Sequence, residues 1–98
     1  MKGIIAHLNK AFENRIRLGI MSVLLVNDEV EFNRMKELLD VSDGNLASHI
    51  SALEKEEYVQ VKKQFVGKKP NTTYKVTKMG RKAFADHLTA LENLLKKK

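Results

Sequence analysis

The sequence predicts an α+β fold that is mainly helical, with a three-stranded antiparallel sheet. Two patterns support this fold class. Apolar residues recur at helical spacing over most of the chain. Residues 58–76 instead alternate as strands do, on both sides of a segment rich in turn-forming residues. The chain has 98 residues, the usual length of one domain, so we expect a single domain over residues 1–98.

The composition agrees with a folded globular chain, at 43% hydrophobic and 31% charged residues. The absence of cysteine excludes disulfides, thiolate metal sites and cysteine nucleophiles. The longest apolar run, residues 19–26, is too short to span a membrane. The N-terminus lacks the layout of a signal peptide. We therefore expect a cytoplasmic protein with no membrane partner.

The first part of the chain predicts two helices and a strand. Apolar residues at helical spacing predict a helix over residues 2–12. Asn14 is placed to cap a second helix, which ends near Val26. The alternation of apolar and polar side chains over residues 30–32 predicts one short strand.

The next segment predicts two helices joined by a tight turn. Asn33 is expected to cap a short amphipathic helix that ends near Leu39. Residues 40–42 form the connection, and Ser42 is expected to cap a helix that runs to about Lys55. Two helices in this arrangement form a helix-turn-helix unit.

The remaining residues predict a β-hairpin and a last helix. Residues 58–66 and 72–76 have strand character, and residues 67–71 between them form the expected tip. Thr77 is expected to cap a helix from residue 78 to about residue 95.

The outer face of the helix over residues 42–55 is suited to enter a DNA groove. Leu46, Ile50 and Leu53 fall on one side of this helix. The other side carries small residues without long acidic side chains: Gly44, Asn45, Ser48, Ser51 and Ala52, with His49 on the flank. Asn can make a bidentate contact with adenine in the major groove, and Ser or His can contact bases or phosphates. The alternative is an ordinary solvated face, and this helix alone does not decide between the two.

The charge distribution favours the DNA-binding interpretation. Residues 1–57 have a formal net charge of −3 and residues 58–98 have +9, within a total of +6. Such asymmetry suggests a polyanionic partner. The lysines gather toward the end of the hairpin, as Lys62, Lys63, Lys68 and Lys69, beside Asn71 and Thr72, which can hydrogen-bond phosphates. The alternative role of the lysines is solubility and protection of an edge strand.

Five segments together resemble small winged-helix transcriptional regulators akin to the MarR and ArsR families. The segments are residues 14–21, 41–50, 53–59, 65–74 and 77–81, and the resemblance covers about residues 14–85. It implies a homodimer in which one helix reads the major groove and the hairpin is the wing. It places Asp43, Gly44, Asn45, Ser48 and His49 on the recognition helix, and Lys68, Lys69 and Asn71 on the wing. From the residues themselves we add Ser42 and Ser51 to the expected DNA-binding helix, and Lys62, Lys63 and Thr72 to the expected DNA-binding hairpin.

The chain also departs from these families. It lacks the long additional helices of MarR proteins, so whether an effector ligand exists stays open. It lacks the cysteine-rich metal motif of many ArsR sensors, so metal sensing is not implied.

The two ends of the chain are expected to form the dimer, through helices over residues 1–12 and 78–98. The apolar positions concerned are Ile4, Ile5 and Leu8 at one end, and Phe84, Leu88, Leu91 and Leu95 at the other, where the 4-3-4 spacing is typical of a coiled-coil seam. The alternative is that these two helices pack on each other within one chain.

No enzyme or cofactor motif is present in the sequence. HExxH, GxSxG and Gly-rich phosphate loops are all missing. His7 and His87 are more simply ordinary partly buried histidines than a metal site. We therefore expect no enzyme activity and no cofactor, but a sequence-specific regulator of transcription that binds double-stranded DNA as a homodimeric repressor. The alternatives are a winged-helix module that binds proteins or one that binds RNA.

Overall fold

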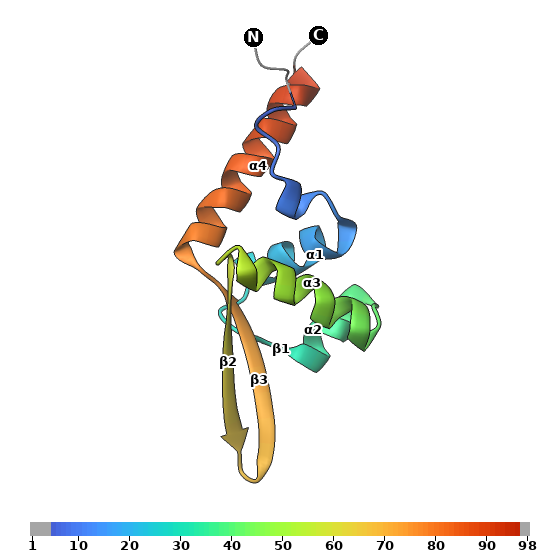
Figure 1. Ribbon diagram of the computed structural model, residues 1–98, viewed down its shortest axis with the longest axis vertical. Helices are drawn as coiled ribbons and strands as arrows, with labels where there is room; N and C mark the ends of the chain where they lie inside the picture. Colours follow the sequence, from blue (N-terminus) through green and yellow to red (C-terminus); the bar gives the residue numbers. More distant parts are fainter. Residues whose placement is uncertain (1–4, 97–98) are drawn as a thin grey trace.

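The computed structural model describes residues 5–96 of the chain (Figure 1). A 3₁₀ turn, Lys10–Phe12, comes first and is followed by α1 (Arg15–Leu25), β1 (Val30–Glu31), α2 (Phe32–Leu39), α3 (Asp43–Lys55), β2 (Val59–Val66), β3 (Lys69–Val76) and α4 (Lys78–Lys96). The strands form one antiparallel sheet in the order β1-β3-β2. The predicted α+β class, mainly helical, is confirmed. No helix in the described range is both long enough and apolar enough to cross a membrane.

The helix predicted over residues 2–12 is wrong for the part that the structure describes. Residues 5–8 form turns and a bend, and only Lys10–Phe12 adopt a 3₁₀ turn. Asn9 lies in extended conformation, and its side-chain oxygen accepts a hydrogen bond from the Ala11 N–H at 2.9 Å. Its own N–H donates to Nδ1 of His87 at 2.9 Å. The segment is therefore attached to α4 instead of forming its own helical hydrogen bonds.

The predicted cap of α1 is confirmed, whereas that of α2 is not. The Asn14 side chain accepts hydrogen bonds from two backbone N–H groups in the first turn of this helix. The expected cap of α2 at Asn33 is wrong. Glu31 is extended, because it pairs with Thr73 in the sheet, and α2 starts directly after it without a side-chain cap.

The turn into α3 follows the prediction. Asp40 ends α2 in the left-handed conformation, with φ 53°. The Ser42 side chain then caps α3 by accepting from the Asn45 N–H. The predicted apolar stripe of α3 is confirmed, since Leu46, Ile50 and Leu53 are at most 2% exposed.

The hairpin tip is tighter than the sequence predicts. Val66 lies opposite Lys69, so the connection is only Gly67 and Lys68. Gly67 has a φ of +68° and Lys68 does not have a positive φ, which is the pattern of a type II′ turn. Pro70 fits in β3 because β1 pairs with this strand only at Tyr74 and Thr73, so β3 has an open edge beside Pro70.

The core lies between α1, α2 and α3 and the sheet, and α4 closes one end of it. Its fully buried side chains are Phe12, Ile20, Met21, Leu24, Met35, Leu46, Ile50 and Leu53. The Thr77 hydroxyl caps α4 by accepting from the Gly80 N–H, as predicted. Beyond the core the molecule is elongated, 56 × 25 × 21 Å, because the hairpin and α4 project from it in opposite directions (Figure 1).

Candidate nucleic-acid interface

The outer face of α3 is open to solvent. Asn45, Ser48 and Ser51 are exposed, and so is Gly44, where an added Cβ would meet nothing within 4 Å. Ala52 is half-buried. This part of the helix therefore presents small side chains that carry no charge.

His49 is half-buried beside this face and is held by a residue that the sequence analysis missed. The Arg17 Nε–H donates to Nδ1 of His49 at 3.0 Å, from α1 to α3. Because Nδ1 accepts, the neutral ring carries its proton on Nε2, which leaves a donor for another partner. No local pattern marks Arg17, because only the packing of α1 against α3 brings the two residues together.

Two of the predicted recognition residues, Ser42 and Asp43, already have partners within the protein at the N-terminus of α3. The Ser42 hydroxyl is the helix cap. Asp43 Oδ1 lies 2.7 Å from Nζ of Lys36 in α2, so this ion pair spans the turn between the two helices. Both side chains are substantially exposed, so the pair contributes little stability. Its effect on the site is that Lys36 offsets the only negative charge in the first turn of α3.

The hairpin has two different faces, which follow from its register. Val61, Lys63 and Phe65 lie opposite Tyr74, Thr72 and Pro70, and these six side chains form the face on the side of the helices. Lys62 and Val66 share the other face with Thr73, Asn71 and Lys69. We call these the inner face and the outer face.

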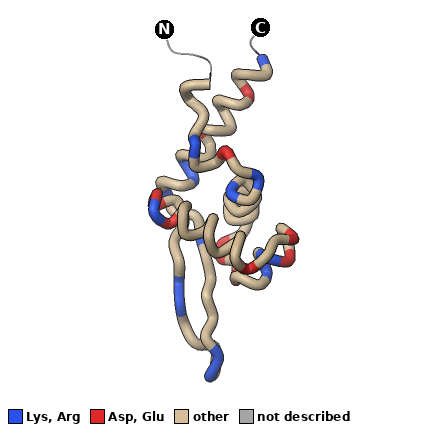
Figure 2. The backbone as a smooth tube through the Cα atoms, turned by 45° about the vertical axis from the view of Figure 1, so that its right-hand side comes forward, with Lys and Arg blue, Asp and Glu red and all other residues tan. Residues whose placement is uncertain are grey.

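Two glutamates form hydrogen bonds with the outer face of the hairpin. The Thr73 hydroxyl donates to Glu29 at 3.0 Å, and the Asn71 amide donates to Glu31 at 2.7 Å. Lys62 Nζ is 3.9 Å from the same Glu29 carboxylate. Asn71 and Lys62 are therefore engaged with acids, which the sequence analysis did not anticipate. Lys63, Lys68 and Lys69 form no ion pair with any described residue, and Figure 2 shows positive charge at the hairpin tip.

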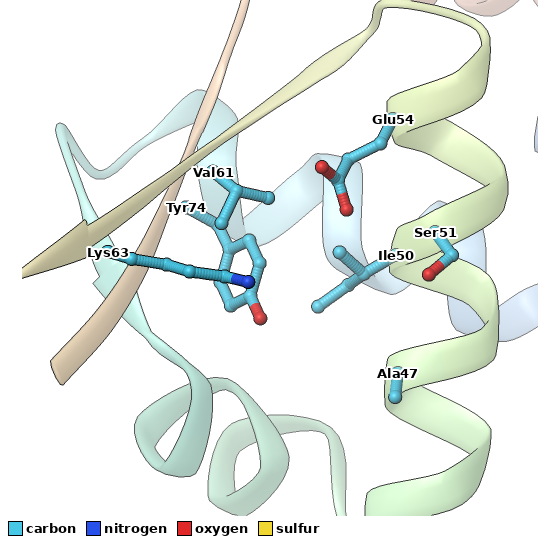
Figure 3. Close-up of a pocket in the computed structure, with 7 residues that line it drawn as sticks. All are labelled: Ala47, Ile50, Ser51, Glu54, Val61, Lys63 and Tyr74. Carbon is cyan, nitrogen blue, oxygen red and sulfur yellow. The ribbon is translucent and has the colours of Figure 1, made fainter. Parts of the chain in front are cut away.

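An open groove of about 450 Å³ lies between α3 and the inner face (Figure 3). It is lined by Ala47, Ile50, Ser51 and Glu54 from α3 and by Val61, Lys63 and Tyr74 from the hairpin. The Lys63 side chain extends across it in front of Tyr74 (Figure 3). Burial, with a smaller effect from the Glu54 charge, raises the pKa of Tyr74 above its usual 10.0. The groove joins the exposed side of α3 to the hairpin, so one ligand can contact both.

The predicted dimer positions separate into exposed and buried residues. Ile5, Leu88, Leu91 and Leu95 are 67%, 45%, 37% and 89% exposed, and Leu8 is half-buried. Ile4 lies outside the described residues. Phe84 does not belong to an exposed seam, because it is 3% exposed and its ring packs edge-to-face on Phe12 at 5.1 Å.

His87 is a buried core histidine. It is 3% exposed, packs against the ring of Phe12 at 5.4 Å, and accepts the Asn9 N–H. His7 is exposed. Within residues 5–96 no three histidine or carboxylate side chains gather as a metal-binding group.

Comparisons with known proteins support the winged-helix architecture. A family model described as a winged helix DNA-binding domain matches residues 16–95. An uncharacterized protein of Methanocaldococcus jannaschii is 34% identical over 87 residues, which cover 89% of this chain and 95% of that protein. A transcriptional regulator homologue from Pyrococcus horikoshii is 31% identical with a TM-score of 0.81, over 95% of this chain and 90% of that one. PadR of Bacillus subtilis, solved in complex with operator DNA, shares the fold at 14% identity and a TM-score of 0.68, over 76% of this chain and 48% of PadR.

Proposed function

Because the chain belongs to the winged helix DNA-binding domain family of transcriptional regulators, we propose that it binds specific sequences of double-stranded DNA as a homodimer and represses transcription. This family and fold are those of regulators and not of enzymes. The observation that carries the proposal is the groove between α3 and the inner face, where Ser51 and Lys63 line the same space. A duplex that lies across this groove touches the exposed side of α3 and the basic hairpin together, and Glu54 is the one acidic residue in the lining.

In the proposed complex, α3 lies in the major groove. Asn45, Ser48 and Ser51 are exposed on this helix and are short enough for its backbone to approach the bases. His49 adds a donor at Nε2, oriented by Arg17. We assign Ser42 and Asp43, both expected among the DNA-binding residues, a structural role instead. They fix the start of α3, because one caps the helix and the other pairs with Lys36.

The hairpin supplies the electrostatic part of binding. Lys63, Lys68 and Lys69 are exposed and have no acidic partner among the described residues. Contacts of such lysines with phosphates position a protein on a duplex without specifying its sequence. We assign the remaining wing residues, Lys62, Asn71 and Thr72, to the support of the hairpin, since two of them contact Glu29 or Glu31.

The proposed dimer contact is the exposed apolar side of α4. Leu88, Leu91 and Leu95 lie along this helix, which projects from the core together with the N-terminal segment (Figure 1). Pairing two copies here leaves both hairpins free and arranges two α3 helices around a two-fold axis. Such a dimer fits half-sites about one helical turn of DNA apart, roughly 34–36 Å. It represses by occupying a promoter.

Selection of bound duplexes from a random pool tests this function directly. We expect enrichment of a two-fold symmetric consensus whose half-sites are about 10 base pairs apart. Enrichment of an asymmetric single site would contradict the dimer. Absence of any enriched duplex, with retention of structured RNA in a parallel competition, would contradict DNA recognition.

A further inference from the structure

Two large apolar side chains are exposed near the end of the hairpin. Phe65 is 73% exposed and Val66 is 62% exposed. They precede the turn directly, and β2 is an edge strand of the sheet. Apolar side chains on an open edge favour aggregation, so their presence at such a position requires a reason.

The two side chains point to opposite faces of the hairpin. Phe65 lies on the inner face, directly opposite Pro70, and follows Lys63 on the same face toward the tip. Val66 lies on the outer face opposite Lys69. Phe65 thus lies on the same face as the groove, one position nearer the tip than Lys63 on that face, whereas Val66 lies on the opposite face.

The charges around Phe65 suit a polyanion. Residues 58–77 contain five lysines and no acidic residue. The acids that hydrogen-bond to the hairpin, Glu29 and Glu31, contact Thr73 and Asn71 on the outer face. The inner face therefore combines the ring of Phe65 with the charge of Lys63, which pairs with neither of these acids, and Lys68 follows in the turn. Glu54 of α3 is the acid that lines the groove on this side.

The backbone of the hairpin tip has little conformational freedom. A two-residue type II′ turn closes it, and the ring of Pro70 fixes the backbone opposite Phe65. Little conformational entropy remains to be lost when such a tip is immobilised on a ligand.

We propose that Phe65, supported by Pro70, acts as an apolar wedge that enters the minor groove beside each half-site and partly unstacks one base step. This inference rests on the proposed DNA binding and adds how the hairpin engages the duplex. Apolar wedges of this kind kink DNA toward the major groove. Pyrimidine–purine steps such as TA are the easiest to unstack, so the wedge selects flexible steps without any hydrogen bond to a base.

Fluorescence of 2-aminopurine tests the wedge, because this base brightens when it is unstacked. The probe is a duplex chosen by the wild-type protein from a random pool, with 2-aminopurine in place of adenine at the TA steps flanking each half-site. We expect fluorescence to rise on saturation with wild-type protein. Phe65→Ser should abolish the rise, weaken binding roughly tenfold and straighten the DNA. Phe65→Leu, which keeps an apolar wedge, should retain most of the signal.

Val66→Ser is the matched control, since it removes an exposed apolar side chain from the outer face of the same hairpin. We expect it to leave both fluorescence and DNA bending unchanged. A saturated wild-type complex without brightening, or equal effects of Phe65→Ser and Val66→Ser, would overturn the wedge while leaving DNA binding intact. Loss of binding to phosphatidylserine vesicles on Phe65→Ser, with unchanged DNA signals, would assign Phe65 to a lipid surface and overturn the wedge. A wild-type protein that selects no duplex at all would overturn the proposed function, and the wedge with it.

Discussion

Tyr74 connects the core, the sheet and the groove. It pairs with Val30 on one side and Val61 on the other, packs near the ring of Phe32, and is 8% exposed. Its position on the inner face also places it in the lining of the groove. Burial of its hydroxyl, more than the nearby Glu54 charge, holds the pKa above 10.0. This residue therefore links stability to the shape of the proposed interface.

The raised pKa of Tyr74 predicts a loss of stability in alkali. The unfolded tyrosine ionises near 10.0, while the folded one keeps its proton to higher pH. The stabilisation is therefore complete below the unfolded value and is lost as pH rises through the folded value. Urea unfolding of wild type and Tyr74→Phe at about pH 8 and about pH 11 should show the larger decrease for wild type. Equal decreases would contradict a raised pKa.

Asn9 is the other residue whose role depends on distant partners. Its N–H donates to His87, 78 positions away, and its side-chain amide donates to the Tyr58 hydroxyl, 49 positions away. These bonds attach the N-terminal segment to α4 and to the region between α3 and β2. They explain why residues 5–9 do not continue as a helix.

At the scale of elements, α4 and the hairpin meet at Tyr58. The Tyr58 carbonyl accepts the Thr77 N–H at 3.0 Å. The backbone of α4 then passes so close to the same carbonyl that only glycine fits at position 80. The first turn of α4 is thereby fixed against the start of β2, which sets the direction in which the helix leaves the core.

Gly80→Ala is expected to destabilise the fold. The new Cβ would collide with the Tyr58 carbonyl, so α4 must shift, at a cost of about 2 kcal/mol or more in the free energy of unfolding. Gly44→Ala is the matched control, because its Cβ meets nothing within 4 Å and alanine favours a helix by about 0.5 kcal/mol. Urea denaturation measures both changes. Equal stabilities of the two variants would show that the close approach at position 80 is not rigid.

The hairpin lysines should determine the salt dependence of DNA binding. Replacing Lys68 and Lys69 with alanine removes two phosphate contacts, so the slope of log affinity against log salt should fall by about 2. Affinity should decrease on all duplexes alike, because phosphate contacts carry no sequence information. Titrations by fluorescence anisotropy at several salt concentrations measure the slope.

Lys82 and Lys96 provide the control for this experiment. Each pairs with an acid one turn away on α4, Asp86 or Glu92. Their double alanine variant removes the same charge from the chain but should keep the wild-type slope. A slope unchanged by loss of Lys68 and Lys69 would contradict the role of the hairpin.

At the scale of the whole molecule, the elongated shape separates two surfaces. The hairpin extends from one end of the core and α4 from the other, over a length of 56 Å (Figure 1). The exposed leucines of α4 thus lie far from the basic tip, and a partner on one surface does not cover the other.

Charged substitutions on α4 are expected to separate the proposed dimer. Leu88→Lys with Leu95→Lys places two cations on the exposed apolar side of the helix. We expect a monomeric mass by sedimentation and an affinity for a two-half-site duplex lower by about 10²-fold. Val26→Lys adds a cation at an apolar position that is 81% exposed at the end of α1, and should leave the mass unchanged. A wild-type protein that is monomeric at all concentrations would contradict the dimer.

Much of this architecture could be predicted because it depends on neighbouring residues. Ser42 and Thr77 cap their helices as expected, and the buried stripe of α3 follows from its spacing. A cap acts within one turn, and a stripe repeats within one helix, so both are visible in a short window of sequence. The expected cap of α2 at Asn33 is wrong because a sheet partner, Thr73, holds Glu31 extended and the helix starts directly after it.

The sequence by itself determined the order of the elements, the neutral outer side of α3 and the basic hairpin, because side-chain size, charge and periodicity are properties of local sequence. Only the tertiary structure decided which polar side chains form hydrogen bonds or ion pairs within the protein. It joined Arg17 to His49 and Asn71 to Glu31, and it placed Phe84 in the core. These contacts connect residues far apart in the chain, and their formation depends on how helices and strands pack, which no short stretch of residues encodes.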